Sequence, residues 1–213
     1  MTIALDHFFI HARPGAPEAD RLRALGLVEG TPNVHPGQGT ANRRFFFLNS
    51  MLELIYVRDG NEAAGGAARE LKMVERAHGA AASPFGLVFR ATSPAEPPPF
   101  PGWPYFAEYL PDGAHFHVGD NADRLDEPLC IVMPCNFPAP PRQPDPLPPF
   151  TTVTSLRVSV PAMKLSQVLV AVDGVGPLSI ASGKPHLLEI EFNAGAAGQE
   201  RDIRPDLPLI VRW

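Results

Sequence analysis

The chain has little cysteine, and its N-terminal apolar run is interrupted. Cys130 and Cys135 are the two cysteines, which is too few for a disulfide scaffold or for paired CxxC zinc motifs. We expect free thiols in a reducing compartment, and therefore a cytoplasmic protein. Asp6, His7 and His11 break the N-terminal run, which argues against a signal peptide. No stretch reaches the ~18 apolar residues that a membrane span needs.

A concentration of basic residues is also missing. The 18 Lys and Arg residues are scattered, and the formal net charge is −5, so the sequence does not favour binding to nucleic acid. The expected partner is a small-molecule ligand rather than a nucleic acid or a membrane. The sequence leaves open whether the chain is a monomer or a homodimer. With 213 residues, 45% of them hydrophobic, it is long enough to bury one sizeable core or two small ones.

Proline is the residue in excess. Of the 26 prolines, 16 fall between Pro94 and Pro149. This stretch cannot hold a normal helix, because each proline lacks an N–H donor and clashes with the preceding turn. Apolar strand-like segments interrupt it, so we expect ordered loops and strands there. Residues 138–149, PAPPRQPDPLPP, are typical of a stiff extended linker.

The first part of the chain predicts the order β, α, β, β, β. The expected elements are a buried strand over 3–12, a helix over 17–25, a short strand at 27–28, and strands over 43–48 and 51–57. Gly26 is a suitable helix stop. A second helix is expected over 61–78, ended by Gly79.

The same order is predicted twice more. After a strand over 84–91, the proline-rich residues 93–104 replace the helix, and strands follow at 105–110, 114–119 and 128–135. The last part offers a strand over 154–160, a helix over 165–174, and strands at 177–180, 186–193 and 207–213. We therefore predict an α+β fold of repeated βαβββ modules.

The first block resembles glyoxalase-like domains of the vicinal oxygen chelate superfamily. LDHFFIHA resembles their opening strand, RALGL the end of their helix, and HPGQGTANRRFFF followed by MLELIYV their GQGT-N loop and LEL strand. The likeness is good over residues 3–57 and weaker over 84–213. It implies curved mixed sheets. The expected units are a paired domain over 1–137 whose second module lacks its helix, a linker over 138–150, and a compact third module over 151–213 packed on the first two.

The resemblance implies a cup with a divalent metal inside, held by His and Glu from the first and last strands of each module. His7 and Glu53 are the matching residues, and Glu53 is the expected catalytic residue. Imidazole and carboxylate suit Zn, Mn, Fe or Ni. Glu53 lies between Leu52 and Leu54, so it faces away from both in a strand. The alternative is that Glu53 lines a wet cavity or bonds to His7 without any metal.

The second half offers no matching pair of ligands. The expected positions hold Gly86 and Leu87, and residues 131–133 are Ile, Val and Met. His115 and His117 share a strand face and are the best additional metal ligands, although they equally suit an exposed hairpin. In the last block, Glu189 and Glu191 suit an exposed strand face, or the cup if the third module pairs with the first.

Four other residues are candidates for substrate binding. His35, Gln38 and Asn42 belong to the glycine-rich loop, and Trp103 belongs to an aromatic cluster near the proline-rich segment. Loop residues of this kind equally serve to bond the loop backbone, and the aromatic cluster equally serves to pack the core.

Two functions from different classes remain. One is a metal-dependent lyase, isomerase or dioxygenase that acts on a small vicinal-oxygen substrate. The other is a metal-free protein that binds or sequesters a small molecule in the same cup. His7 and Glu53 favour the first, whereas the absence of a second ligand pair favours the second.

Overall fold

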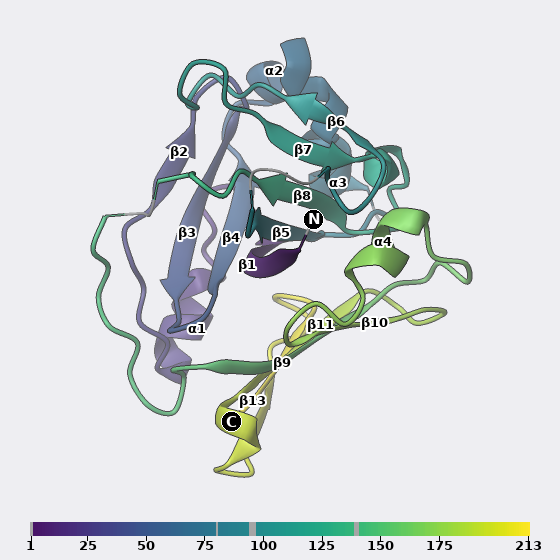
Figure 1. The fold of residues 1–213 in the computed structure, drawn as a ribbon. Helices are drawn as coiled ribbons and strands as arrows, with labels where there is room; N and C mark the ends of the chain where they lie inside the picture. Colours follow the sequence, from purple (N-terminus) through teal and green to yellow (C-terminus); the bar gives the residue numbers. More distant parts are fainter. Residues whose placement is uncertain (1, 80, 94–96, 139–140) are drawn as a thin grey trace.

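The computed structural model describes residues 2–79, 81–93, 97–138 and 141–213. It shows a mixed α+β protein with two curved mixed sheets and few helices, which confirms the predicted fold class (Figure 1). Residues 94–96 of the predicted helix-free stretch and residues 139–140 of the predicted linker lie outside the described residues. No helix in the described ranges is long and apolar enough to cross a membrane.

The larger sheet has eight strands in the order β2-β3-β4-β1-β5-β8-β7-β6. Their bounds are β1 Ile3–His11, β2 Asn33–His35, β3 Thr40–Phe46, β4 Met51–Val57, β5 Phe85–Ala91, β6 Gly102–Tyr105, β7 Phe116–Gly119 and β8 Leu129–Met133.

The eight strands form two halves of the same design. In the first half, the opening strand β1 pairs in parallel with the last strand, β4, and in the second half β5 pairs in parallel with β8. The antiparallel pairing of β1 with β5 joins the halves at the centre of the sheet. The arms β2–β4 and β6–β8 curve toward the same side, so the sheet forms a cup (Figure 1).

The smaller sheet has five strands in the order β10-β9-β11-β13-β12. Their bounds are β9 Val153–Ser159, β10 Leu178–Ala181, β11 Leu187–Phe192, β12 Glu200–Asp202 and β13 Leu209–Arg212. Here the opening strand β9 pairs in parallel with β10, the strand that follows the helix, and not with the last strand. The strand order therefore differs from that of either half of the cup.

The helices are short. They are α1 Ala19–Leu25, α2 Gly60–Ala63, α3 Met73–His78 and α4 Gln167–Val172, with 3-10 turns η1 Gly66–Leu71, η2 Asp120–Asp123 and η3 Asn193–Gly195. The prediction of one helix over 61–78 is wrong. Gly65 and Gly66 interrupt it, and Lys72 adopts a left-handed conformation with φ 56°. Gly26 ends α1 with φ 111°, as predicted.

The predicted strand over 105–110 is also wrong. β6 ends at Tyr105, and a turn follows in which the Leu110 N–H bonds to the Ala107 carbonyl. Proline has no N–H to donate. Pro104 is tolerated because β6 is an edge strand, and no neighbouring strand lies on its outer side to accept a hydrogen bond. No strand forms at 27–28, where Glu29 makes only an isolated bridge to Phe45.

The main core lies between the convex face of the cup and the smaller sheet. Alternate residues of the central strands point into it, together with the inner faces of β9, β11 and β13 and of helices α1 and α4. Examples from the two sheets are Phe8, Leu52 and Leu54, and Leu156 and Ile190. The Asn49 side chain exchanges two hydrogen bonds with the Val153 backbone and so ties the β3–β4 turn to β9.

A second, smaller core fills part of the concave face. It includes Phe9, Leu71, Met73 and Phe116, of which Leu71 and Met73 come from the helical segment that follows β4. This segment closes one end of the cup. On the concave face, the side chains of β1 and β4 outside this smaller core therefore point into an interior space.

A substitution at Gly39 would test how closely the loop between β2 and β3 is packed. The φ of Gly39 is +68°, and an added Cβ would lie 2.4 Å from the Ala63 N and the Asp59 O. We expect Gly39→Ala to lower the free energy of unfolding by roughly 2–4 kcal/mol, because strain and a backbone clash combine. Gly66 has φ +47° with open space around it, so Gly66→Ala should cost about 1 kcal/mol. Urea unfolding of both variants measures the difference, and equal losses would contradict the clash.

Candidate functional site

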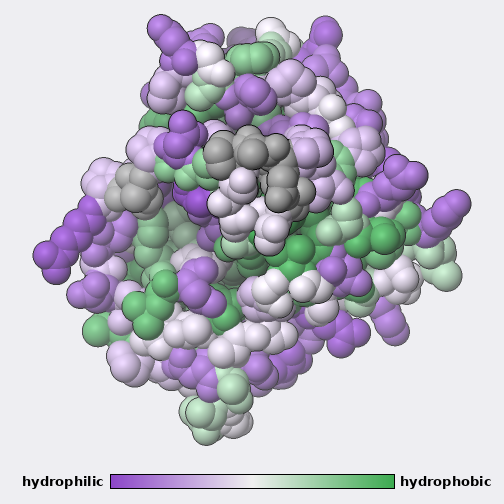
Figure 2. All heavy atoms as spheres, in the orientation of Figure 1, coloured by the Kyte–Doolittle hydropathy of each residue, from purple (hydrophilic) through white to green (hydrophobic). Residues whose placement is uncertain are grey.

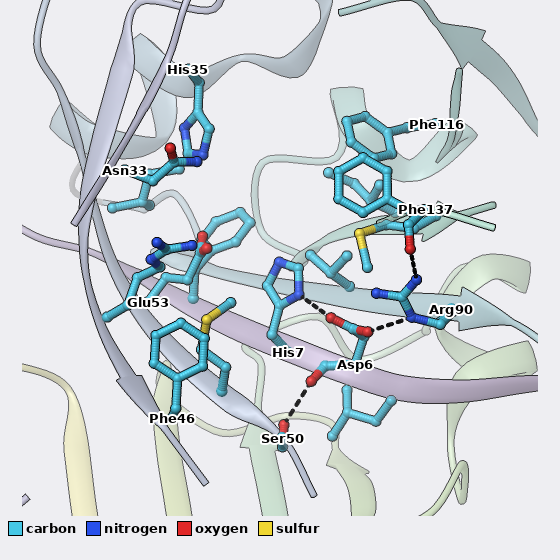
Figure 3. Close-up of a pocket in the computed structure, with 18 of the residues that line it drawn as sticks. Asp6, His7, Asn33, His35, Phe46, Ser50, Glu53, Arg90, Phe116 and Phe137 are labelled. Atoms are coloured by element: carbon cyan, nitrogen blue, oxygen red, sulfur yellow. Dashed lines mark hydrogen bonds and ion pairs between the residues drawn. The ribbon is translucent and has the colours of Figure 1, made fainter. Parts of the chain in front are cut away.

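The cup contains a cavity of about 870 Å³. We call Asp6, His7, His35, Gln38, Arg44 and Glu53 its polar wall, and Val88, Phe116, Ile131, Met133 and Phe137 its apolar wall. Phe46, Met51 and Ile55 of the first half and Arg90 and Tyr109 of the second half also line the cavity. The polar wall comes from the first half of the sheet and the loop between β2 and β3. The apolar wall comes mostly from the second half. Figure 3 shows Glu53 and His35 on one side of the space and Phe116 and Phe137 on the other. Figure 2, in the orientation of Figure 1, shows apolar residues between hydrophilic ones on the visible face of the molecule.

A β-bulge in β1 places Asp6 and His7 side by side at the cavity. Leu5 pairs with Phe89 and His7 pairs with Val88, so Asp6 is an extra residue on the β1 side of the register. Leu5 lies in the main core, whereas both Asp6 and His7 line the cavity. In a regular strand, consecutive residues would point to opposite faces. The bulge therefore gives the site two adjacent polar groups.

Asp6 links His7 to an arginine of the second half. Its carboxylate lies 2.7 Å from the His7 Nδ1 and 2.8 Å from the Arg90 Nε (Figure 3). Arg90 also donates to the Phe137 carbonyl. Burial opposes ionisation of Asp6, but the hydrogen bonds and charges of His7 and Arg90 outweigh it and lower its pKa.

This pairing fixes the tautomer of His7. An ionised carboxylate only accepts hydrogen bonds, so the His7 Nδ1 must carry a proton. The Nε2 atom of neutral His7 then has a free lone pair. The arrangement resembles the carboxylate–histidine pairs that orient catalytic bases and metal ligands.

Glu53 is a buried carboxylate without a partner. β4 alternates as predicted, with Leu52 and Leu54 in the main core and Glu53 in the cavity. The Glu53 residue is 7% exposed, and it makes no hydrogen bond or ion pair with any residue that the structure describes. Its carboxylate faces the cavity, so a hydrogen-bond donor of a ligand in the cavity can reach it.

Arg44 lies across from Glu53 on the neighbouring strand β3. Its guanidinium bonds to the backbone and hydroxyl of Thr31 and lies over the Phe46 ring. Burial lowers the pKa of Arg44, and the charge of Glu53 partly offsets this effect. The group remains cationic at neutral pH. Both acidic groups of the polar wall are therefore accompanied by an arginine.

The glycine-rich loop brings His35 and Gln38 to the cavity. Gln38 Nε2 donates to the Thr40 hydroxyl, which also lies 2.9 Å from the His35 Nδ1. Tyr109, which comes from the second half of the cup, donates its hydroxyl hydrogen to the side-chain oxygen of Gln38. His35 is 8% exposed, and burial lowers its pKa, so it is neutral at neutral pH.

The apolar wall lies where the resemblance predicts the second pair of metal-ligating residues. Val88 lies directly across from His7 and pairs with Ile131 of β8, and Met133 lies two residues further along β8, opposite Arg90. At Gly86, an added Cβ would lie 1.9 Å from the Phe9 ring. The Phe9 ring thus occupies the space that a ligating side chain at this position would need.

The remaining predicted site residues lie elsewhere. Asn42 is 1% exposed, and its side-chain oxygen accepts from the Asn33 N–H, which holds β2 against β3. Trp103 is in β6 and packs at the edge of the smaller core. His115 is exposed with its ring against Phe106, and the His117 Nε2 bonds to the Phe100 carbonyl.

None of these four side chains lines the cavity. Glu189, on β11 of the smaller sheet, pairs with Arg212 and lies away from the cup.

The donor set does not fit a metal centre. Zinc and related ions take three or four protein ligands. In the described part of the chain, no group of three or more His, Cys, Asp and Glu side chains is placed to hold an ion. His7 and Glu53 alone fall short of the usual number, and Arg44 and Arg90 add positive charge beside them.

Three residues that organise the site have no role in the sequence-based prediction: Asp6, Arg44 and Arg90. Tyr109 belongs to the aromatic cluster expected either to wall a ligand pocket or to pack the core. All four are polar, and each lies next to or within an apolar strand or aromatic segment. That local signal marks them as unusual. Their partners are up to 84 residues away in the chain, so no local spacing reveals the pairs.

A second hollow of about 410 Å³ lies at the end of β1, between His11, Glu18, His78 and Asp206. Both ring nitrogens of His11 are buried and have no hydrogen-bond partner in the described residues. Burial, with the nearby charges of Arg76 and His78, lowers the pKa of His11 to about 3. His11 lies on the same side of β1 as His7, but it lines this second hollow and not the main cavity.

His11 should make the protein sensitive to acid. The folded state holds it neutral, whereas the unfolded chain protonates it below a pKa of 6.5, so falling pH favours unfolding. Between about pH 8 and about pH 5 we expect a loss of about 2 kcal/mol from this residue. His11→Phe should flatten the pH dependence of urea unfolding by that amount. His115→Phe, at an exposed position, is the control, and an equal slope in both variants would refute the assignment.

Comparison with known proteins supports the fold. No protein-family model matches the chain, and no curated protein matches it. A hypothetical protein from Staphylococcus aureus aligns with a TM-score of 0.57 at 11% identity, covering 100% of this chain and 98% of that one. At this identity the likeness concerns the fold alone.

Two further structures are less similar. A hypothetical protein from Bacillus halodurans has a TM-score of 0.39 at 14% identity and covers 66% of this chain and 100% of its own. A variant of 4-hydroxymandelate synthase from Streptomyces coelicolor has a TM-score of 0.43 at 10% identity and covers 98% of this chain and 61% of its own. Neither carries an argument about function. The curved mixed sheet is compatible with the glyoxalase-like resemblance seen in the sequence.

Proposed function

We propose that this chain is a glyoxalase-like protein of the vicinal oxygen chelate type whose cup binds a small molecule without a metal ion. The ligand places a polar group against His7 and Glu53, and an apolar body against the opposite wall. The division of one cavity into a polar and an apolar wall is the observation that carries this proposal.

The apolar wall supports an organic ligand with an aromatic or aliphatic body. Phe116 and Phe137 face the cavity opposite Glu53, and Ile131 and Met133 continue the wall (Figure 3). Contact with such side chains contributes about 25 cal/mol for each Å² of apolar ligand surface removed from water. The cavity volume of about 870 Å³ is in the usual range for a small-molecule site.

The charges of the polar wall disfavour a divalent cation. Asp6 is already paired with Arg90, and Glu53 lies beside Arg44. A metal ion would meet two guanidinium groups and only two free ligands. A neutral ligand that donates a hydrogen bond to Glu53 avoids this repulsion and pairs the buried carboxylate.

The second candidate is a metal-dependent lyase, isomerase or dioxygenase acting on a vicinal-oxygen substrate. One observation favours it: His7 and Glu53 lie on neighbouring parallel strands and point into the same cavity. In that case, His7, oriented by Asp6, and Glu53 would hold the ion, which would supply Lewis acidity. The missing ligands place this candidate second.

Filling the cavity should abolish ligand binding. N-phenyl-naphthylamine, which fluoresces in apolar surroundings, should bind the wild-type protein with one molecule per chain. Val88→Trp extends a side chain into the cavity and should weaken binding by about tenfold or more, which corresponds to ~1.4 kcal/mol. Fluorescence titration measures both.

The same substitution at Val170, which is 64% exposed on α4, is the matched control and should leave binding unchanged. Ile131→Phe serves as a second variant if Val88→Trp unfolds. Equal affinity in the Val88 and Val170 variants would show that the fluorophore binds elsewhere, and would contradict the proposal.

Metal analysis separates the two candidates. Purified protein incubated with Zn²⁺, Mn²⁺, Fe²⁺ or Ni²⁺ and then freed of excess ion should contain well below one equivalent, because two ligands bind weakly. One full equivalent that disappears in both His7→Ala and Glu53→Gln, but not in His115→Ala, would establish the metal-dependent candidate instead. Elemental analysis is the measurement.

A further inference from the structure

Three hydrogen-bonding side chains lead from the second half of the cup to His35. Tyr109 donates to Gln38 over 3.0 Å, and Gln38 donates to Thr40 over 2.9 Å. The Thr40 Oγ1 lies 2.9 Å from the His35 Nδ1. Thr40 is 0% exposed and Gln38 is 5% exposed, so the bond between their side chains is shielded from bulk solvent. We call these three residues the relay.

The direction of the relay is set by its first member. The Tyr109 hydroxyl faces the side-chain oxygen of Gln38, which can only accept, so Tyr109 is the donor. The Gln38 oxygen is then the acceptor, and its NH₂ group donates to the Thr40 oxygen. The hydroxyl hydrogen of Thr40 is free to donate to the His35 Nδ1. A nitrogen that accepts carries no hydrogen.

Glu53 favours the same arrangement of His35. It is the charged group with the largest electrostatic effect on His35, and no hydrogen bond joins the two residues. A ring nitrogen with a bare lone pair near this carboxylate would be repelled, whereas an N–H is attracted. Figure 3 shows the His35 ring and the Glu53 carboxylate on the same side of the cavity, with space between them and the apolar wall.

We propose that the relay holds His35 as the neutral Nε2–H tautomer, and that this N–H donates to a carbonyl oxygen of the ligand. This inference rests on the proposed function, since it names the chemistry of the molecule that the cup takes. The site then presents two imidazoles of opposite kind. His7 offers a lone pair, because Asp6 takes its Nδ1–H, and His35 offers a donor.

The ligand class follows from these groups. A carbonyl oxygen accepts from His35, and the remainder of the molecule lies against Phe116 and Phe137. The neutrality of His35 suits an uncharged acceptor, because a charged donor would favour a carboxylate or phosphate instead. The class is an aromatic or alkyl carbonyl compound that also carries a hydrogen-bond donor for Glu53, as in a hydroxy ketone.

Nitrogen NMR of the ligand-free protein tests the tautomer directly. In protein labelled with ¹⁵N-histidine, long-range ¹⁵N–¹H correlation distinguishes a protonated ring nitrogen from a bare one. We expect His35 to show a protonated Nε2 and a bare Nδ1 at neutral pH, and His7 to show a protonated Nδ1. A protonated Nδ1 in neutral His35 would overturn the proposal, whether or not any ligand binds.

Substitution of Thr40 tests the relay as the cause. Thr40→Val has almost the same shape but no hydroxyl, so the His35 Nδ1 should lose its donor and its ¹⁵N shift should move toward that of a mixture of tautomers. Thr40→Ser keeps the hydroxyl and should preserve the wild-type spectrum. An unchanged His35 spectrum in Thr40→Val would show that the relay does not set the tautomer. If Thr40→Val unfolds, Tyr109→Phe removes the first donor and tests the same relay.

A pair of fluorophores tests the carbonyl. Prodan is an aromatic ketone, and dimethylnaphthylamine has the same ring system without the ketone. We expect the ratio of their affinities to fall about threefold to tenfold in His35→Phe, as for one lost neutral hydrogen bond. It should not change in His115→Phe, where the histidine is exposed.

If both fluorophores bind and the ratio is unchanged in His35→Phe, the carbonyl inference fails while the proposed binding function stands. Failure of both to bind the wild-type protein would overturn the proposed function together with the ligand class. The NMR result would still decide the tautomer.

Discussion

The antiparallel pairing of β1 with β5 joins the two halves of the cup, and the bulge in this pairing organises the site. The extra residue, Asp6, reverses which side chains of β1 face the main core and which face the cavity. It also places the carboxylate between His7 and Arg90, one group from each half. The bulge at Asp6 in the β1–β5 pairing therefore orients His7 and holds Arg90 across the two central strands.

The two halves share a strand plan but differ in chemistry. The first supplies Glu53 and the hydrogen-bonded loop, whereas the second supplies hydrocarbon and aromatic surface. Phe9 illustrates how one residue enforces the difference, because its ring covers Gly86 and leaves no room for a side chain there. Repetition of a fold thus produced an asymmetric cavity, which suits a molecule with one polar and one apolar end more than a symmetrically coordinated ion.

Much of the fold could be predicted from the sequence, but less of the site could. The alternation LELI predicted correctly that Glu53 and Leu52 face opposite ways, because a strand has a period of two wherever it lies. The helix expected over 61–78 failed because the Gly65-Gly66 pair and Lys72 interrupt it. His115 and His117 share a strand-like spacing, but His115 precedes β7 and contacts Phe106, and His117 bonds to the Phe100 carbonyl, so neither side chain lines the cavity.

The sequence by itself determined the α+β class, most of the strands, the face of β4 on which Glu53 lies, and the loop that carries His35. These features depend on residues close together in the chain, where periodicity and glycine positions act directly. Only the tertiary structure decided that Arg90 pairs with Asp6, that Tyr109 bonds to Gln38, and that Glu53 has no hydrogen bond or ion pair with any described residue. Such pairings form between segments separated by tens of residues, and their geometry follows from how the sheet curves and packs.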